Sequence, residues 1–243
     1  MLADLSVLQM LLVVLAVVAG AVVQGAIGMG FGTVLVPVLA LVAPTMLPAT
    51  VLLLALLLTA LMAFRERGAI DASGIPLLLV GRLLGTGVAV WLLVSLSQAA
   101  LEVLFGVVLI GVVLLSTMRT AVRPTPVATL TAGTASGLFS TTTGIGGPPV
   151  AMLYQTRPGP ELRSTLAAFF LLGVVVSLAG LLAAGRLLWT HVLLAVVLAP
   201  ALVGGFAISR PLARYLDARW LRPAVLLFAA IGGVLAIIRG VTG

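Results

Sequence analysis

The sequence predicts an all-α polytopic membrane protein, and three observations lead to this prediction. Hydrophobic residues make up 62% of the 243 residues and charged residues only 8%. No charged side chain occurs between Asp4 and Arg65, a stretch too long and too apolar for a water-soluble protein. Two glycine-rich motifs, around Gly28 and around Gly144, interrupt apolar stretches, one in each half of the chain. Since a spanning helix needs about 20 apolar residues, the chain is long enough for about six to eight crossings.

Charged and turn residues divide the chain into about eight apolar segments, and each is expected to be helical. No hydrophilic stretch is long enough for a separate soluble domain, so residues 1–243 are expected to form one integral membrane domain. The first segment is too long for one straight span and contains the first glycine motif, and the fifth contains the second. The segments cover residues 5–42, 46–64, 74–95, 99–118, 127–155, 163–184, 190–209 and 222–239.

The first segment could be confused with a signal peptide, but it lacks a basic start and follows Asp4. Its apolar run also continues into the glycine motif, so we expect it to be retained.

Arginine clusters separate the later segments and set the expected orientation. The net charge is +7, every basic residue is arginine, and no cluster occurs at the chain start or between the third and fourth segments. Positive residues favour the cytoplasmic side. Eight plain crossings, the alternative, cannot place all clusters there. They share that side if segments one and five are broken, re-entrant hairpins, which puts the N-terminus outside. The clusters contain Arg65, Arg67, Arg119, Arg123, Arg157, Arg163, Arg210, Arg214, Arg219 and Arg222.

The two halves are expected to be inverted repeats, about 5–118 and about 127–239. The glycines of the two motifs occupy matching positions in the halves, and Thr50 matches Thr165 at nearly the same offset. Matching breaks in the two halves of a transporter-sized membrane chain indicate a solute site between repeats.

The glycine motifs are the main candidates for that site. Glycine lets a solute or a partner backbone approach the main chain, and half-helix N-termini attract anions. Pro37 and the pair Pro148 and Pro149 follow the breaks, as expected at the first turn of a helix. The alternative for each motif is close packing between helices. The predicted solute-binding residues of the motifs are Gly28, Gly30, Gly32, Thr33, Thr141, Thr142, Thr143, Gly144, Gly146 and Gly147, with Ser140 directly before the threonines.

Arg82 is the basic residue that lies well inside a segment, between Gly81 and Gly85. An ionisable residue within the membrane is a functional candidate by default, and a guanidinium suits sulfonate, sulfite or carboxylate oxygens. We therefore add Arg82 to the predicted solute-binding residues. The competing interpretation is that its side chain reaches the nearer membrane surface.

The remaining composition argues against other chemistry. The chain has no cysteine, and no buried carboxylate series is apparent that could relay protons or hold sodium. We expect no metal site, no cofactor and no nucleic-acid binding, since no basic face is interleaved with aromatic residues. The expected partners are a small anionic solute and the lipid bilayer, and a homo-oligomer is one arrangement that the composition allows. An inside-negative potential favours anion export.

Two other function classes are open. Ser136 and the single histidine, His191, resemble the dyad of an intramembrane serine hydrolase, although Thr134 stands where the usual motif has glycine. A non-transporting membrane scaffold is the second alternative, but it would not need paired broken helices.

The two motifs, the segment number and the length together resemble the TauE/SafE family, the sulfite exporter or 4-toluene sulfonate uptake permease group. The residues that carry the resemblance are 24–37 and 137–149. Phe31 and Pro148 interrupt the glycine triplets that the family motif often contains. The resemblance implies a bacterial-type inner-membrane, multi-pass transporter, without enzymatic activity, of sulfur-containing or organic anions.

Overall fold

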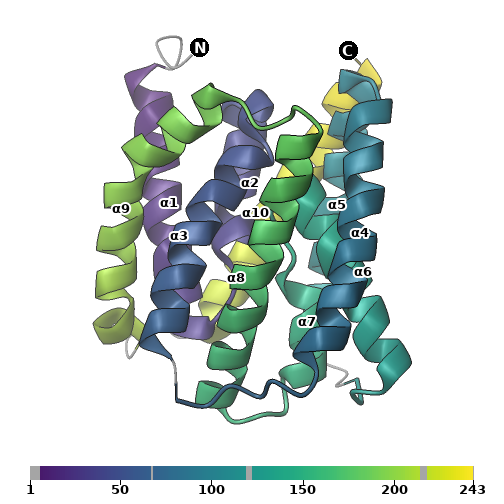
Figure 1. The fold of residues 1–243 in the computed structure, drawn as a ribbon. Helices are drawn as coiled ribbons and strands as arrows, with labels where there is room; N and C mark the ends of the chain where they lie inside the picture. The colour runs from purple at the N-terminus through teal and green to yellow at the C-terminus, as the bar shows by residue number, and fades with distance from the viewer. Residues whose placement is uncertain (1–5, 67, 119–121, 214–217, 243) are drawn as a thin grey trace.

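The computed structural model describes residues 6–66, 68–118, 122–213 and 218–242. These residues form a bundle of helices without strands, which confirms the predicted all-α class (Figure 1). The α-helices are α1 Val7–Ile27, α2 Phe31–Val42, α3 Ala49–Arg65, α4 Ile75–Ser95, α5 Gln98–Thr117, α6 Pro126–Thr143, α7 Gly147–Tyr154, α8 Gly159–Ala183, α9 Trp189–Ala213 and α10 Ala218–Thr242, with a short 3-10 helix at Pro44–Met46.

Both glycine motifs break their helices. The predicted segment 5–42 is divided into α1 and α2, and the predicted segment 127–155 into α6 and α7. Pro148 and Pro149 lie in the first turn of α7, where a missing N–H leaves no helical hydrogen bond unmade. Pro37 differs from the expectation, because it lies in the interior of α2 and not in its first turn.

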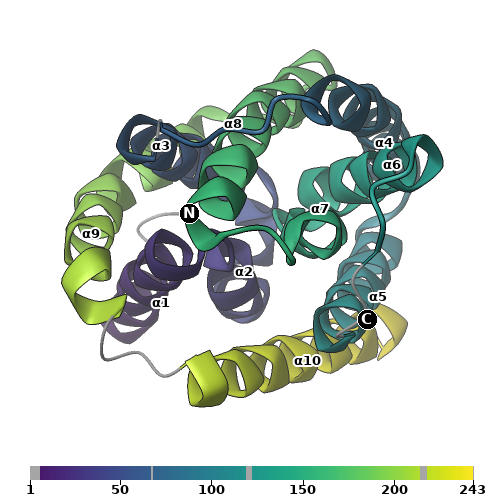
Figure 2. The ribbon, with the colours of Figure 1, turned by 90° about the horizontal axis from the view of Figure 1, so that it is seen from below.

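The two broken segments enter the bundle from opposite ends. In Figure 1, α1 descends and α2 returns upward, whereas α6 ascends and α7 returns downward. Viewed from below, the short halves α2 and α7 lie inside a ring formed by the other helices (Figure 2). The ring keeps the irregular backbone of both breaks away from the outer surface of the bundle.

Among the described residues, five helices are long and apolar enough to cross a membrane: α1, α4, α5, α8 and α9. The expectation of about eight spanning segments is therefore not confirmed. The reason is local: α2 and α7 are half-helices, α3 has only 17 residues, and α6 is rich in hydroxyl side chains. The apolar part of α10 is also shorter than a full span.

The ends of α3, α5, α7 and α9 lie at the lower end of the bundle in Figure 1, and these ends adjoin the arginine-rich connections. The described ends of these four helices therefore lie on one side of the bundle, as the positive-inside pattern requires of a single cytoplasmic face. Arg67, Arg119 and Arg214 lie outside the described residues, as do the side chains of Arg219 and Arg222.

Glycines bring α4 and α6 into backbone contact. A Cβ atom on Gly81 or Gly85 would collide with the backbone of α6, and one on Gly133 or Gly137 with the backbone of α4. Each pair is spaced four residues apart, the arrangement that lets membrane helices pack closely. The backbone of α6 thus fills the space beside Gly81 and Gly85.

We expect Gly85→Ala to lower the thermal stability of the purified protein, because its new methyl group would collide with the Thr134 carbonyl oxygen. The backbone of α6 cannot move aside as the end of a flexible side chain can, so the free energy of unfolding should fall by about 1–3 kcal/mol. Gly87→Ala is the matched control, since nothing lies within 4 Å of its Cβ position. Equal melting temperatures for the two variants in the same detergent would contradict this packing.

Candidate functional site

Positive-φ glycines produce both breaks. Gly28 ends α1 with φ 101° and Gly30 precedes α2 with φ 119°, while Gly144 ends α6 with φ 89°. Residues with a Cβ rarely adopt these angles. A Cβ on Gly28 would also approach Arg163, at 3.0 Å from its Cγ atom. The chain can reverse direction here because glycine occupies these positions.

Side chains and carbonyls satisfy several backbone donors at the breaks. Gln24, buried in α1, accepts a hydrogen bond from the Phe31 N–H through Oε1 at 3.1 Å, so it bridges the first break. In the second break the Gly144 N–H donates to the Ser140 carbonyl at 2.7 Å. The Ile145 N–H donates to the Thr143 hydroxyl at 3.3 Å. Both breaks are therefore ordered turns held by specific partners.

The two motifs meet in the interior of the bundle. A methyl group on Gly32 would lie 2.6 Å from the Gly144 carbonyl oxygen and 2.9 Å from Ile145 Cγ1. A Cβ atom on Gly147 would lie 3.4 Å from Met29 Cβ. The N-terminal ends of α2 and α7 are thus brought together between the outer helices.

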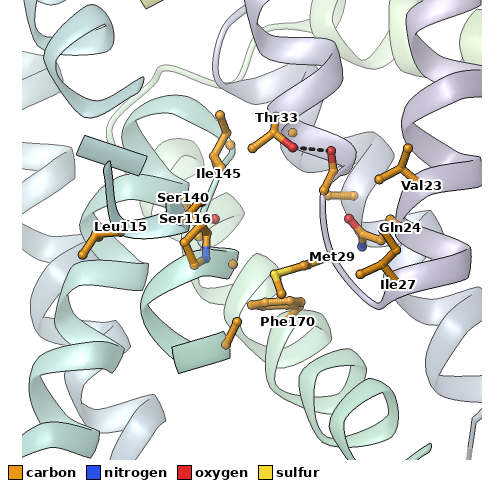
Figure 3. Close-up of a pocket in the computed structure, with 18 of the residues that line it drawn as sticks. Val23, Gln24, Ile27, Met29, Thr33, Leu115, Ser116, Ser140, Ile145 and Phe170 are labelled. Atoms are coloured by element: carbon orange, nitrogen blue, oxygen red, sulfur yellow. Dashed lines mark hydrogen bonds between the residues drawn. The ribbon is translucent and has the colours of Figure 1, made fainter. Parts of the chain in front are cut away.

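A cavity of about 300 Å³ lies beside this contact. Figure 3 shows Gln24 and Ile27 on one side and Ser116 and Ser140 on the other, with Met29 next to Phe170 between them. The lining extends to the exposed residues Met118 and Gln155, which follow α5 and α7 at the arginine-rich end. The cavity therefore runs from the two breaks toward that end of the bundle.

Seven of the predicted site residues line this cavity and four do not. The lining includes Gly30, Gly32, Thr33, Arg82, Gly144, Gly146 and Gly147. Outside it are Gly28, Thr141, Thr142 and Thr143.

The Arg82 side chain is fully buried at the inner wall of the cavity and does not reach the membrane surface. Its Nη1 donates to Ser136 Oγ at 3.1 Å, and its Nη2 donates to Ser140 Oγ at 2.8 Å and to Ser177 Oγ at 3.0 Å. Its Nε has no hydrogen-bond partner. Gly173 makes room for the guanidinium, because a Cβ there would lie 2.8 Å from its Cζ.

The threonines of the second motif are occupied elsewhere. The Thr142 hydroxyl donates to the Leu138 carbonyl at 2.7 Å, and the Thr143 hydroxyl donates to the Phe139 carbonyl at 2.8 Å. Such bonds to the same helix are the usual way to satisfy hydroxyls in apolar surroundings. Thr141 instead shares hydrogen bonds with Ser177 at 2.8 Å and with Thr86 at 3.2 Å.

Sequence reasoning missed Gln24, Thr59 and Phe170 as cavity residues, and Ser177 as a partner of Arg82. Gln24 could have been identified from the sequence, because it is a polar residue in an apolar stretch, seven positions before the first residue of α2. Ser177 could not, because its role depends on how α8 packs against α4.

Ser136 and His191 make separate hydrogen bonds. Ser136 Oγ donates to the Gly146 carbonyl at 2.7 Å and accepts from Arg82. The His191 ring accepts from the Leu188 N–H at 3.0 Å and lies 3.2 Å from the Thr45 carbonyl oxygen. This arrangement does not favour the hydrolase alternative, whose serine and base must share a hydrogen bond.

Among the described residues, no group of three or more His, Cys, Asp or Glu side chains could hold a metal ion.

Comparison with known proteins identifies one family. The sequence model of the family described as sulfite exporter TauE/SafE matches residues 12–236, which is most of the chain. Searches among curated proteins and among solved structures find no significant match.

The contrast between Ser140 and Thr142 gives a test of the site. Ser140→Ala removes a partner that orients Arg82 and a cavity hydroxyl that can donate to a bound anion. A hydrogen bond to a charged anion is worth about 1.5–3 kcal/mol, so anion affinity should fall roughly tenfold or more. Thr142→Val, nearly isosteric, removes a hydroxyl that serves its own helix and should change affinity by less than about twofold. Calorimetric titration of both purified variants measures this. A larger loss in Thr142→Val would place the site nearer the threonines.

Proposed function

This chain belongs to the TauE/SafE family, a membrane transporter family for sulfite and related anions, and from this premise we propose that it moves a small sulfur-containing or organic anion across a bacterial-type inner membrane. The observation that carries the proposal is Arg82. Its guanidinium is fully buried at the wall of the cavity and is held by three serine hydroxyls. A full positive charge in this position attracts an anion more strongly than a neutral hydrogen-bond donor would.

In this proposal the anion binds between the two breaks. Gly30, Gly32, Gly144, Gly146 and Gly147 give it close access to the main chain. Arg82 and Ser140 supply charge and hydroxyl contacts at the inner wall, and Thr33 of α2 also lines the cavity. Gly28 acts through backbone conformation, and Thr141 through the hydroxyl network behind Arg82. Thr142 and Thr143 hold the end of α6.

We also propose that the halves are inverted repeats, because the packing is paired. The contact of α1 with α9 corresponds to that of α6 with α4, and the contact of α2 with α10 to that of α7 with α5. The contacts of α3 with α8 and of α5 with α10 join equivalent helices. This is the pattern expected from a two-fold axis in the membrane plane.

Alternating access follows from the way the second break covers Arg82. Gly146 packs against Ser136 and Ser140, the partners of Arg82. A movement of α7 would therefore uncover or close the inner wall, while the cavity already leads toward the arginine-rich end. With that end cytoplasmic, export of one negative charge gains about 2.3 kcal/mol per 100 mV. We propose export on this ground.

Transport into or out of proteoliposomes tests the function. A panel of sulfite, thiosulfate, sulfoacetate and aryl sulfonates should contain at least one anion that the wild-type protein moves and that empty liposomes do not. Absence of transport for the whole panel, with the protein correctly inserted, would contradict the proposal.

We expect Arg82→Gln to abolish transport of that anion with the fold retained. Arg82→Lys should weaken binding about tenfold, because an ammonium lacks the planar fork that reaches several oxygens. Binding by calorimetry and melting temperature are compared for both variants. Wild-type affinity in both would remove Arg82 from the site.

His191→Ala separates a transporter from the hydrolase alternative. The described hydrogen bonds of the His191 ring go to backbone groups. Transport should therefore stay within about twofold of wild type in this variant, whereas a hydrolase without its base fails almost completely. Flux per inserted protein is the measurement. Complete loss of function in this variant would reopen the enzymatic interpretation.

A further inference from the structure

The charge environment of Arg82 differs from that of the arginines at the lower end. Arg65 and Arg163 share the carboxylate of Glu66, at 3.3 and 3.6 Å. Arg157 pairs with Asp71 at 3.5 Å and with Glu161 at 3.3 Å. No described carboxylate makes an ion pair with Arg82.

The polar partners of Arg82 are all neutral. They are hydroxyls of α6 and α8, with the Phe169 ring 5.7 Å from the guanidinium carbon. From Ser177, the hydroxyls of Thr141 and Thr86 continue as a chain away from Arg82. Hydroxyls donate and accept hydrogen bonds, but they carry no net charge. The site therefore has one full positive charge that nothing in the described protein neutralises.

The rest of the cavity wall adds no second charge. Among the described residues that line it, Arg82 alone is charged. The N-terminal ends of α2 and α7 contribute partial positive charge, but several of their backbone N–H groups are not available to bind an anion. Gln24 occupies the Phe31 N–H, and Pro148 and Pro149 have no N–H to offer in α7.

From this charge count we propose that the site selects singly charged oxyanions, such as sulfonates and hydrogen sulfite, over dianions of similar size. The proposal rests on the transport function above and specifies its substrate class. A monoanion neutralises Arg82. A dianion leaves one uncompensated negative charge in an apolar interior, which is strongly unfavourable.

Two matched pairs of anions test the proposal on the wild-type protein in proteoliposomes and by calorimetry. Methanesulfonate and sulfate share a tetrahedral sulfur centre but differ in charge. The monoanion 2-hydroxyethanesulfonate and the dianion sulfoacetate share a two-carbon frame. In each pair the monoanion should bind at least about tenfold more tightly.

The pH dependence provides an independent readout. Total sulfite should bind more weakly as pH rises through the second ionisation of sulfurous acid, because the singly charged form disappears. Methanesulfonate does not titrate in that range and should bind equally throughout. A parallel decline for both anions would assign the effect to the protein and count against the proposal.

A pair of variants at Ser140 tests the charge count itself. Ser140→Asp places a carboxylate beside Arg82 Nη2 and should abolish binding of monoanions, because the site becomes neutral before any anion enters. Ser140→Asn is the control of similar size and should retain measurable binding. Melting temperatures show whether each variant folds. If neither folds, the measurements with the two matched anion pairs on the wild-type protein still test the proposal.

The outcomes distinguish this inference from the proposed function. Transport of sulfate or sulfoacetate as effective as that of the matched monoanion would overturn the charge selection and leave anion transport intact. If no anion of either charge is transported or bound, both proposals fail.

Discussion

Backbone N–H and C=O groups freed at a helix break cannot remain in lipid, and the fold is built around this constraint. Both breaks lie inside a ring of helices, where Gln24 and Thr143 accept hydrogen bonds from freed N–H groups. The breaks also lie against each other at Gly32 and Gly144. The ring of helices that keeps the irregular backbone out of lipid also encloses a cavity beside it. The candidate solute site is therefore a direct consequence of burying the two helix breaks.

The parts of this fold that depend on local chemistry could be predicted from the sequence. Positive φ at Gly28 and Gly144 is a property of glycine itself, and the helices that end before the arginine-rich connections end on one side of the bundle. The partners of Arg82 could not be predicted, because they are selected by packing between helices distant in sequence. In α6, Ser136 and Ser140 lie one turn apart and face Arg82, whereas the more conspicuous Thr142 and Thr143 bond to their own helix. Within the run of hydroxyls at 140–143, Ser140 is the residue that contacts Arg82.

Glycine also explains how an apolar bundle accommodates Arg82. Gly137 lets α6 approach the Arg82 carbonyl, and Gly173 leaves space beside the guanidinium. The result is a cation held by neutral dipoles alone. Such an arrangement stabilises the charge less completely than a carboxylate would, and it keeps an affinity for an added anion that an internal ion pair would remove.

The pairing of α1 with α9, and of α4 with α6, has a consequence for biosynthesis. Each pair joins a helix from the first half of the chain to one from the second. Gly25 of α1 contacts Ser209 and Phe206 of α9, a helix near the end of the sequence. During translation, α1 therefore enters the bilayer long before its partner exists, and its glycine-bearing face is covered by lipid in the meantime. A chain that stops before α9 therefore leaves this face of α1 without its protein partner.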